Sequence, residues 1–204
     1  MSENVYLGFD IGGTKIAVCV GDSNGQILAS DRLDGGTTQP YTEILPRLLT
    51  MGDRLIAEAG LSLADITACG ISAPGPLDPD QGILEKSPNM IWEEVPIRDD
   101  IAAHFKLPTT LENDGNAGAL AEWYFGAAKG ARNAIYFTMS TGIGGGIIAE
   151  NRLLRGTCGN AGELGHAILD VNGPVCGCGM RGCFEAFCSG RNVQKRLRAM
   201  VGND

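Results

Sequence analysis

Three cysteines and one histidine lie close together in the second half of the sequence. Cys176, Cys178 and Cys183 have the spacing Cys-x-Cys-x₄-Cys, and His166 lies ten residues upstream. Three thiolates and one imidazole are the donor set of a closed, tetrahedral structural zinc site. We therefore predict that these four residues bind Zn²⁺; the alternative is a group of unlinked thiols beside a core histidine. The spacing is not that of common zinc fingers, so it does not indicate a nucleic-acid interface.

Two glutamates flank this cluster. Glu163 lies three residues before His166, and Glu185 lies two residues after Cys183. A metal that fixed this loop would also fix both carboxylates, which accept hydrogen bonds from the hydroxyl groups of a sugar. Taken alone, each glutamate is better explained as a solvated surface charge.

A glycine-rich turn near the N-terminus has the residue types that bind phosphate. Glycines let the backbone approach an anion and aim consecutive N–H groups at it. A preceding aspartate suits Mg²⁺, held directly or through water. The order of the threonine and the lysine excludes a P-loop, and a simple hairpin turn is the alternative. The residues concerned are Asp10, Gly12, Gly13, Thr14 and Lys15.

A second glycine loop spans residues 140–146 and includes Thr141 and Gly142. It does not fit the dinucleotide pattern G-x-G-x-x-G, because Ile147 occupies the final glycine position. A hairpin bend is the alternative. The two loops sit in equivalent strand–turn–strand segments, over 5–20 and 134–149, which favours a nucleoside triphosphate held between two similar domains.

Asn113 and Asp114 lie at an expected junction between a strand and a helix. The dipole at the start of a helix favours the ionised form of Asp114, which could then accept a proton from an alcohol during phosphoryl transfer. Asn113 offers the donor and acceptor that sugar hydroxyls require. The alternative is an ordinary helix cap.

The elements that must position these residues alternate between strands and helices. Hydrophobic periodicity and turn residues predict an α/β fold with mixed sheets, beginning with an antiparallel meander. The helices are expected over 41–59, 97–105, 116–124 and 183–199. The strands are expected over 5–9, 16–20, 26–30, 66–72, 109–111, 134–138 and 146–149, and residues 156–183 should have little regular structure.

Composition restricts the classes of partner. The net charge of −8 disfavours nucleic acid and anionic membranes, because both would repel the protein. No apolar run is long enough to span a bilayer, and the N-terminus lacks the features of a signal peptide. We therefore expect a cytoplasmic protein whose seven cysteines are thiols or metal ligands.

Five segments together resemble the ROK family (repressors, uncharacterised reading frames and kinases). They are DIGGTK at 10–15, APGPLD at 73–78, ENDGNAGALAE at 112–122, STGIGGGI at 140–147 and the cysteine-containing stretch 159–190. The last is the most specific, because it combines the zinc ligands with the sugar-contacting positions of the family.

The resemblance implies ATP-dependent phosphorylation of a hexose, with glucose the leading substrate and Asp114 the catalytic base. Zn²⁺ would be structural, and Mg²⁺ would accompany ATP. The implied sugar-binding residues are Gly75, Asn113, Asp114, Glu163, His166 and Glu185. The implied Mg·ATP-binding residues are Asp10, Gly12, Gly13, Thr14, Lys15, Thr141 and Gly142.

The resemblance also implies the two-domain actin-like ATPase fold, similar to hexokinase and ribonuclease H. We expect an N-terminal domain over 1–115 and the start of a second domain over 116–204, incomplete because family kinases are longer. Family members are often dimers or tetramers, so a homo-oligomer is expected. N-acetylglucosamine kinase, N-acetylmannosamine kinase and a non-catalytic sugar-binding module stay open as alternatives. A repressor is disfavoured, because the first glycine loop begins at residue 10 and leaves no room before it for a winged helix.

Overall fold

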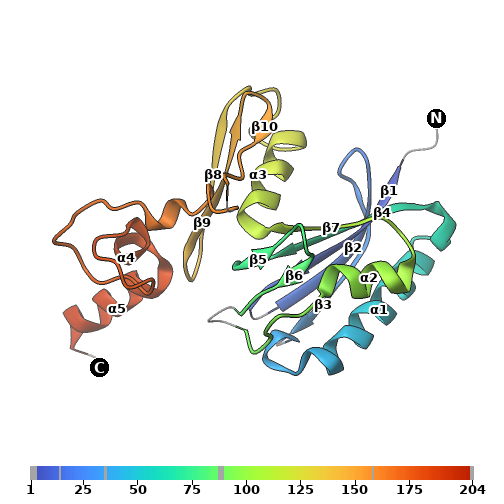
Figure 1. Cartoon of the computed structure of the whole chain (residues 1–204), viewed down its shortest axis with the longest axis horizontal. Helices are drawn as coiled ribbons and strands as arrows, with labels where there is room; N and C mark the ends of the chain where they lie inside the picture. The colour runs from blue at the N-terminus through green and yellow to red at the C-terminus, as the bar shows by residue number, and fades with distance from the viewer. Residues whose placement is uncertain (1–3, 14, 35, 87–89, 158, 203–204) are drawn as a thin grey trace. The chain divides into compact units, whose positions relative to one another are not determined.

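The computed structural model describes residues 4–13, 15–34, 36–86, 90–157 and 159–202 (Figure 1). Strands and helices alternate, as predicted for an α/β protein. The chain forms two compact units, Met1–Asp114 (unit 1) and Gly115–Asp204 (unit 2). Each unit is described by itself.

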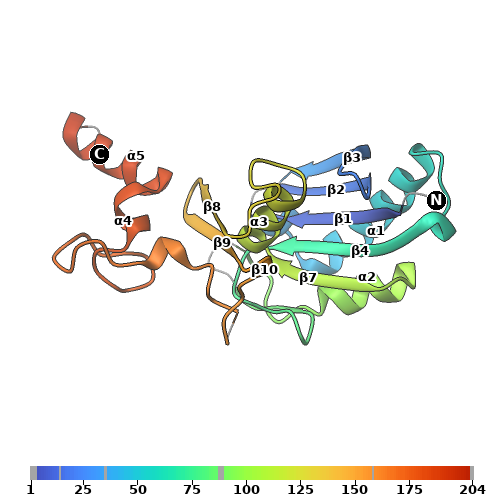
Figure 2. The same ribbon diagram turned by 90° about the horizontal axis from the view of Figure 1, so that it is seen from above.

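Unit 1 is built on a five-stranded sheet with the order β3-β2-β1-β4-β7 (Figure 2). Its first three strands form the predicted antiparallel meander, whereas β4 runs parallel to β1 and β7 runs parallel to β4. The sheet is therefore mixed. The strands are β1 (Val5–Ile11), β2 (Lys15–Asp22), β3 (Ile27–Asp34), β4 (Ile66–Ala73) and β7 (Thr109–Asn113).

Two helices cover one face of this sheet, α1 (Tyr41–Glu58) against β2 and β3 and α2 (Ile97–Phe105) against β4 and β7 (Figure 1). Alternate residues of β1 and β2 are buried, as the two-residue period of a strand requires. In α1, Ile44, Leu48 and Leu55 follow a helical period and are fully buried. Strands and helices thus contribute to one continuous apolar core.

Short elements connect these layers. The 3-10 helices η1 (Gly36–Thr38) and η2 (Leu63–Asp65) flank α1, and the strands β5 (Leu77–Asp78) and β6 (Ile83–Leu84) form a small hairpin. The buried Trp92 donates a hydrogen bond from Nε1 to the Gln39 carbonyl at 2.9 Å. That bond ties the segment before α2 to the segment before α1.

Unit 2 contains most of α3 (Asp114–Tyr124) and a three-stranded antiparallel sheet with the order β10-β9-β8. Trp123 near the end of α3 donates a hydrogen bond to the Ala131 carbonyl at 2.8 Å. The remaining elements are β8 (Ala134–Met139), β9 (Ile143–Ala149), β10 (Arg152–Leu153), η3 (Leu164–His166), α4 (Phe184–Cys188) and α5 (Gly190–Val201).

Close backbone approach replaces large side chains where α3 meets β9. A Cβ atom on Gly115 would lie 2.3 Å from the Gly145 carbonyl oxygen, and one on Gly162 would lie 2.4 Å from the same oxygen. A Cβ atom on Gly146 would lie 2.6 Å from that of Ala119. Only glycine leaves room for this contact.

Two elements predicted in unit 2 have different boundaries in the structure. β9 begins at Ile143 and not at residue 146, because the backbone of Gly144–Gly146 pairs with β8. These glycines have no side chains, so the sequence shows no strand periodicity there. The helical run after residue 183 breaks into α4 and α5 at Ser189, whose extended backbone precedes α5 and whose side chain caps it. Among the described residues, no helix is both long and apolar enough to cross a membrane.

Leu48→Ala tests the packing of α1 on the sheet. Leu48 is fully buried, so its truncation should lower the free energy of unfolding by about 2–5 kcal/mol, measured by urea denaturation. Leu63→Ala is the matched control. Leu63 is 40% exposed, and its truncation should cost about 0.5 kcal/mol or less. Equal losses for the two variants would contradict the described packing.

Candidate functional site

The carboxyl ends of three parallel strands carry candidate residues of unit 1. β1, β4 and β7 are mutually parallel, so their carboxyl ends share one edge of the sheet. Asp10 lies near the end of β1, Gly75 follows β4, and Asn113 ends β7. This is the edge at which ligands bind in open α/β sheets.

Asp10 is held at this edge by a neighbouring strand. Its side chain is solvent-exposed and accepts a hydrogen bond from Ser72 Oγ at 3.0 Å, because Asp10 and Ser72 are partners in the β1–β4 register. The Gly12 N–H donates to the Lys15 carbonyl at 2.9 Å and closes the turn after β1. Thr14, which was predicted to bind phosphate, lies outside the described residues.

The segment after Gly75 is fixed by a residue that sequence reasoning missed. The guanidinium group of Arg98 in α2 donates to three successive backbone carbonyls, those of Pro79, Asp80 and Gln81, at 3.1, 2.8 and 3.0 Å. The turn of the β5–β6 hairpin is therefore fixed to α2. No spacing in the sequence relates Arg98 to this turn.

Asn113 and Asp114 stand at the junction of β7 and α3. The helix begins at Asp114, two residues earlier than predicted, so the aspartate is in its first turn. Its side chain is exposed, and a helix N-terminus stabilises a negative charge there. Asn113 is half-buried and pairs with Ala73 of β4.

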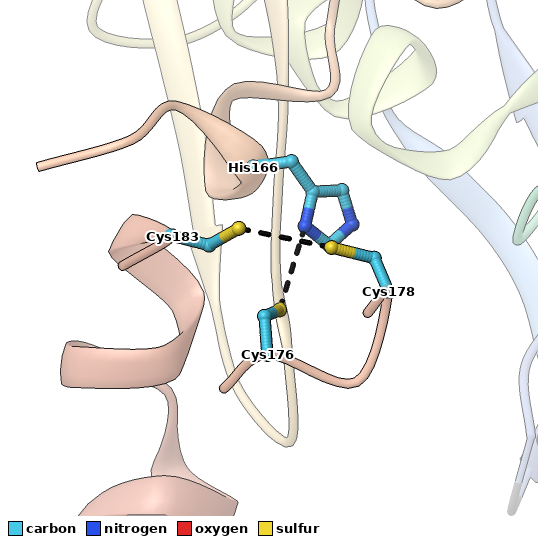
Figure 3. Close-up of side chains that lie close together, drawn as sticks. All are labelled: His166, Cys176, Cys178 and Cys183. Atoms are coloured by element: carbon cyan, nitrogen blue, oxygen red, sulfur yellow. Dashed lines mark hydrogen bonds between the residues drawn. The ribbon is translucent and has the colours of Figure 1, made fainter. Parts of the chain in front are cut away.

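In unit 2, His166, Cys176, Cys178 and Cys183 converge as the sequence predicted (Figure 3). One donor atom from each residue lies within 4.8 Å of all the others. The Cys176 Sγ atom is 3.7 Å from His166 Nδ1, and the Cys178 and Cys183 Sγ atoms are 3.7 Å apart. η3 supplies the histidine, and Cys183 is the residue immediately before α4.

Two of these separations match the spacing of ligands around one tetrahedral ion. With Zn–S bonds of about 2.3 Å and Zn–N bonds of about 2.1 Å, two sulfur ligands of a tetrahedron lie about 3.8 Å apart, and a sulfur and a nitrogen about 3.6 Å apart. Both values are close to the 3.7 Å found for the Cys178–Cys183 and Cys176–His166 pairs. Three sulfur atoms and one imidazole nitrogen are also donors that suit zinc. The cluster is therefore consistent with a zinc site.

The thiols of the cluster differ in their tendency to ionise. Burial raises the pKa of Cys183 to about 12 and also raises the pKa of Cys176. A hydrogen bond from the Met180 backbone lowers the pKa of the exposed Cys178. A metal that binds thiolates must displace protons from the two buried cysteines, so its uptake is coupled to pH.

The two glutamates contact different residues around the cluster. Glu163 is exposed, and its Oε2 atom is 3.8 Å from His166 Nε2, on the side of the ring away from Nδ1. Glu185 is half-buried and accepts a hydrogen bond from the Ile143 N–H at 2.8 Å. Glu185 therefore contacts the first residue of β9, within the predicted second glycine loop, a contact that the sequence did not predict.

The sequence pattern of the ROK family matches residues 6–202. The chain belongs to the ROK family. Its relatives include the glucokinase of Streptomyces coelicolor, 40% identical over 185 residues, and that of Thermotoga maritima, 37% identical over 202 residues. The xylose repressor of Bacillus subtilis is 37% identical over 194 residues. These alignments cover 91%, 97% and 94% of this chain, respectively.

Solved ROK structures confirm the fold. The ROK hexokinase of Thermus thermophilus superposes with a TM-score of 0.86 at 38% identity, over 97% of this chain and 64% of that protein. A ROK glucokinase of Streptomyces griseus, in complex with glucose and AMPPNP, superposes with a TM-score of 0.78 at 37% identity, over 97% and 62%. The fold is thus the α/β actin-like ATPase fold, as predicted.

The ROK relatives are longer than this chain. It spans 56% of the length of the S. coelicolor glucokinase, 61% of the T. maritima glucokinase and 50% of the B. subtilis repressor. Both kinases and repressors are among these relatives, and both contain the region that matches this chain.

Metal analysis tests the cluster. Protein purified without chelators should contain about one zinc ion per chain by elemental analysis, because four suitable donors converge. Cys183→Ser should lose most of this zinc, and zinc affinity should fall as the pH is lowered, because protons compete for the thiolates.

Cys188→Ser is the matched control, because Cys188 lies in α4 outside the quartet. It should keep the full zinc content. Wild-type protein without metal, or Cys183→Ser with undiminished metal, would contradict the zinc assignment.

Proposed function

We propose that this chain carries the sugar-binding and catalytic part of an ATP-dependent hexose kinase, with glucose as the leading substrate. The observation that carries the proposal is the similarity to proteins named glucokinase, at 37–40% identity over nearly the whole chain. The superposition on a glucokinase in complex with glucose and AMPPNP supports it further.

Asp114 is the proposed catalytic base. It is an exposed carboxylate in the first turn of α3, directly after β7. During phosphoryl transfer an alcohol needs orientation and a proton acceptor late in the reaction. Asp114 would accept the proton of the attacking sugar hydroxyl, and Asn113 would donate to and accept from a neighbouring hydroxyl.

Mg·ATP would occupy the two glycine loops. Asp10 would hold Mg²⁺ directly or through water, and the turn from Gly12 to Lys15 would direct N–H groups and a positive charge at the phosphates. Thr141 and Gly142 would do the same from the second loop. The exposure of Asp10 and the turn geometry after β1 are compatible with this role.

The sugar would be bound by Gly75 through its backbone, by Asn113 and Asp114, and by the side chains of Glu163, His166 and Glu185. Zn²⁺ would be bound by His166, Cys176, Cys178 and Cys183 as a structural ion, giving the irregular loop a fixed shape. His166 Nδ1 lies next to the thiol donors, whereas Nε2 is directed at Glu163. The ring could therefore bind metal through one nitrogen and a hydroxyl through the other.

A non-catalytic sugar-binding module is the second candidate. The observation that favours it is the 37% identity to a xylose repressor. A kinase and a sugar-binding module of this family would share the fold. The two candidates therefore differ only in whether the bound sugar is phosphorylated. N-acetylglucosamine and N-acetylmannosamine are the alternative substrates if the chain is a kinase.

Asp114→Asn tests the catalytic base. In an assay that couples ADP release to NADH oxidation, the variant should lose at least about a hundredfold in kcat, because the proton acceptor is gone. Sugar-dependent thermal protection should persist, because the amide still forms hydrogen bonds.

Asp99→Asn in α2 is the matched control. Asp99 is 62% exposed and forms a surface ion pair with Arg98, so its loss should leave turnover unchanged. Full turnover in Asp114→Asn would refute the assigned base.

A panel of sugars tests the substrate class. A hexose that binds the folded state should raise Tm by about 5 °C at a concentration near 100 Kd. We expect the largest shift with glucose, measured beside N-acetylglucosamine, N-acetylmannosamine, fructose and xylose. A shift with xylose and none with glucose would favour the non-catalytic module instead.

A further inference from the structure

Of the second glycine loop, predicted over 140–146, only residues 140–142 lie outside the strands; they form a tight turn between β8 and β9 (the 140–142 loop). The Ser140 N–H donates to the Gly142 carbonyl at 2.9 Å, so the turn closes within three residues. The proposed nucleotide contacts, Thr141 and Gly142, lie in this turn. Its position depends on neighbours that lie some 20–50 residues further along the chain.

One of these neighbours is Glu185 in α4. Its Oε2 atom accepts the Ile143 N–H at 2.8 Å, and a Cβ atom on Gly142 would lie only 2.6 Å from the same oxygen. A hydrogen bond to a charged acceptor is among the stronger interactions that a backbone N–H forms. The carboxylate therefore fixes the end of the loop and lies directly against Gly142.

The start of α5 holds the beginning of the loop. The Gly190 N–H donates to the Ser140 carbonyl at 2.8 Å. The preceding Ser189 is buried, and its hydroxyl accepts a hydrogen bond from the Asn192 side chain, which also donates to the Glu185 carbonyl. α4 and the start of α5 are therefore linked to each other by hydrogen bonds, and together they hold the loop.

η3 contacts the carbonyl group of Ile143. Gly165 is buried, and a Cβ atom built on it would lie 2.1 Å from the Ile143 carbonyl oxygen. The backbone of η3 is therefore in direct contact with the first residue of β9. The N–H of Ile143 is thus bonded to Glu185, and its carbonyl group is in contact with η3.

The metal donors connect the two elements that contact Ile143, η3 and α4. His166 is the last residue of η3, and Cys183 immediately precedes α4. The Cys176 Sγ atom also lies 3.9 Å from Glu185 Oε1. An ion bound by the quartet would thus fix the distance between the two elements that hold Ile143.

We propose that the metal cluster positions the 140–142 loop through Gly165 and Glu185, and that Glu185 is a positioning residue for this loop. Metal binding then governs the conformation of the turn proposed to bind phosphate, as well as the positions of the carboxylates proposed to bind sugar. The nucleotide part of this inference rests on the proposed function, whereas the loop part does not.

Hydrogen exchange of the amides in residues 140–146, followed by mass spectrometry, tests the loop part. Glu185→Ala should speed this exchange by about tenfold, the loss expected when a hydrogen bond to a charged group is removed. Glu185→Gln keeps an acceptor oxygen and should restore most of the protection. Removal of the metal from wild-type protein with a chelator should speed exchange in the same segment.

Glu163→Ala is the matched control. Glu163 lies beside His166 Nε2, whereas the hydrogen-bond acceptor for the Ile143 N–H is Glu185. It should leave the exchange of residues 140–146 unchanged, and all three variants should keep the wild-type zinc content. Unchanged exchange in Glu185→Ala, or an equal increase in Glu163→Ala, would overturn the proposal.

AMPPNP titration tests the nucleotide part. Glu185→Ala should weaken AMPPNP binding by about tenfold while Glu185→Gln stays close to wild type. A residue that served the sugar alone would leave AMPPNP affinity unchanged in both variants, and that result would overturn the nucleotide part. Wild-type protein that binds no AMPPNP would contradict the proposed function, and the exchange comparison would still decide the loop part.

Discussion

Four side-chain donors converge in a part of the chain that has little regular structure. Unit 1 is held by an extended apolar core, whereas the buried cluster around the donors contains only Cys176, Cys183 and Ala186 among the described residues. An irregular loop that buries so little apolar surface gains little to offset the entropy of ordering its backbone. The convergence of the donors is therefore the constraint on which η3, the start of α4 and their neighbours depend.

The sequence predicted the elements whose side chains repeat with a clear period. The bounds of α2 agree with the expected 97–105, because its buried residues Ile97, Ile101 and Phe105 are four apart. The start of β9 was missed, because glycines carry no side chains from which a period can be recognised. The break at Ser189 was missed because the pattern on both sides of it is helical.

In the candidate site, too, some features could be predicted from the sequence and others could not. The metal cluster was predictable because Cys176, Cys178 and Cys183 are close in sequence and their spacing reflects one local structure. The bond between Ile143 and Glu185 spans 42 residues, and no pattern links the two positions. Kinases and repressors are both similar to this chain, so catalysis and sensing are separated by the chemistry of the site and not by the fold.

Each of the two units contains one of the two tryptophans of the chain. Trp92 is buried in unit 1 and bonded to the Gln39 carbonyl, whereas Trp123 is in unit 2 and bonded to the Ala131 carbonyl. Intrinsic fluorescence is therefore a natural reporter for both halves of the molecule. With Trp123 replaced by phenylalanine, tryptophan emission comes from the N-terminal half alone, and with Trp92 replaced it comes from the C-terminal half. The unfolding of the two halves can then be followed separately without an attached dye.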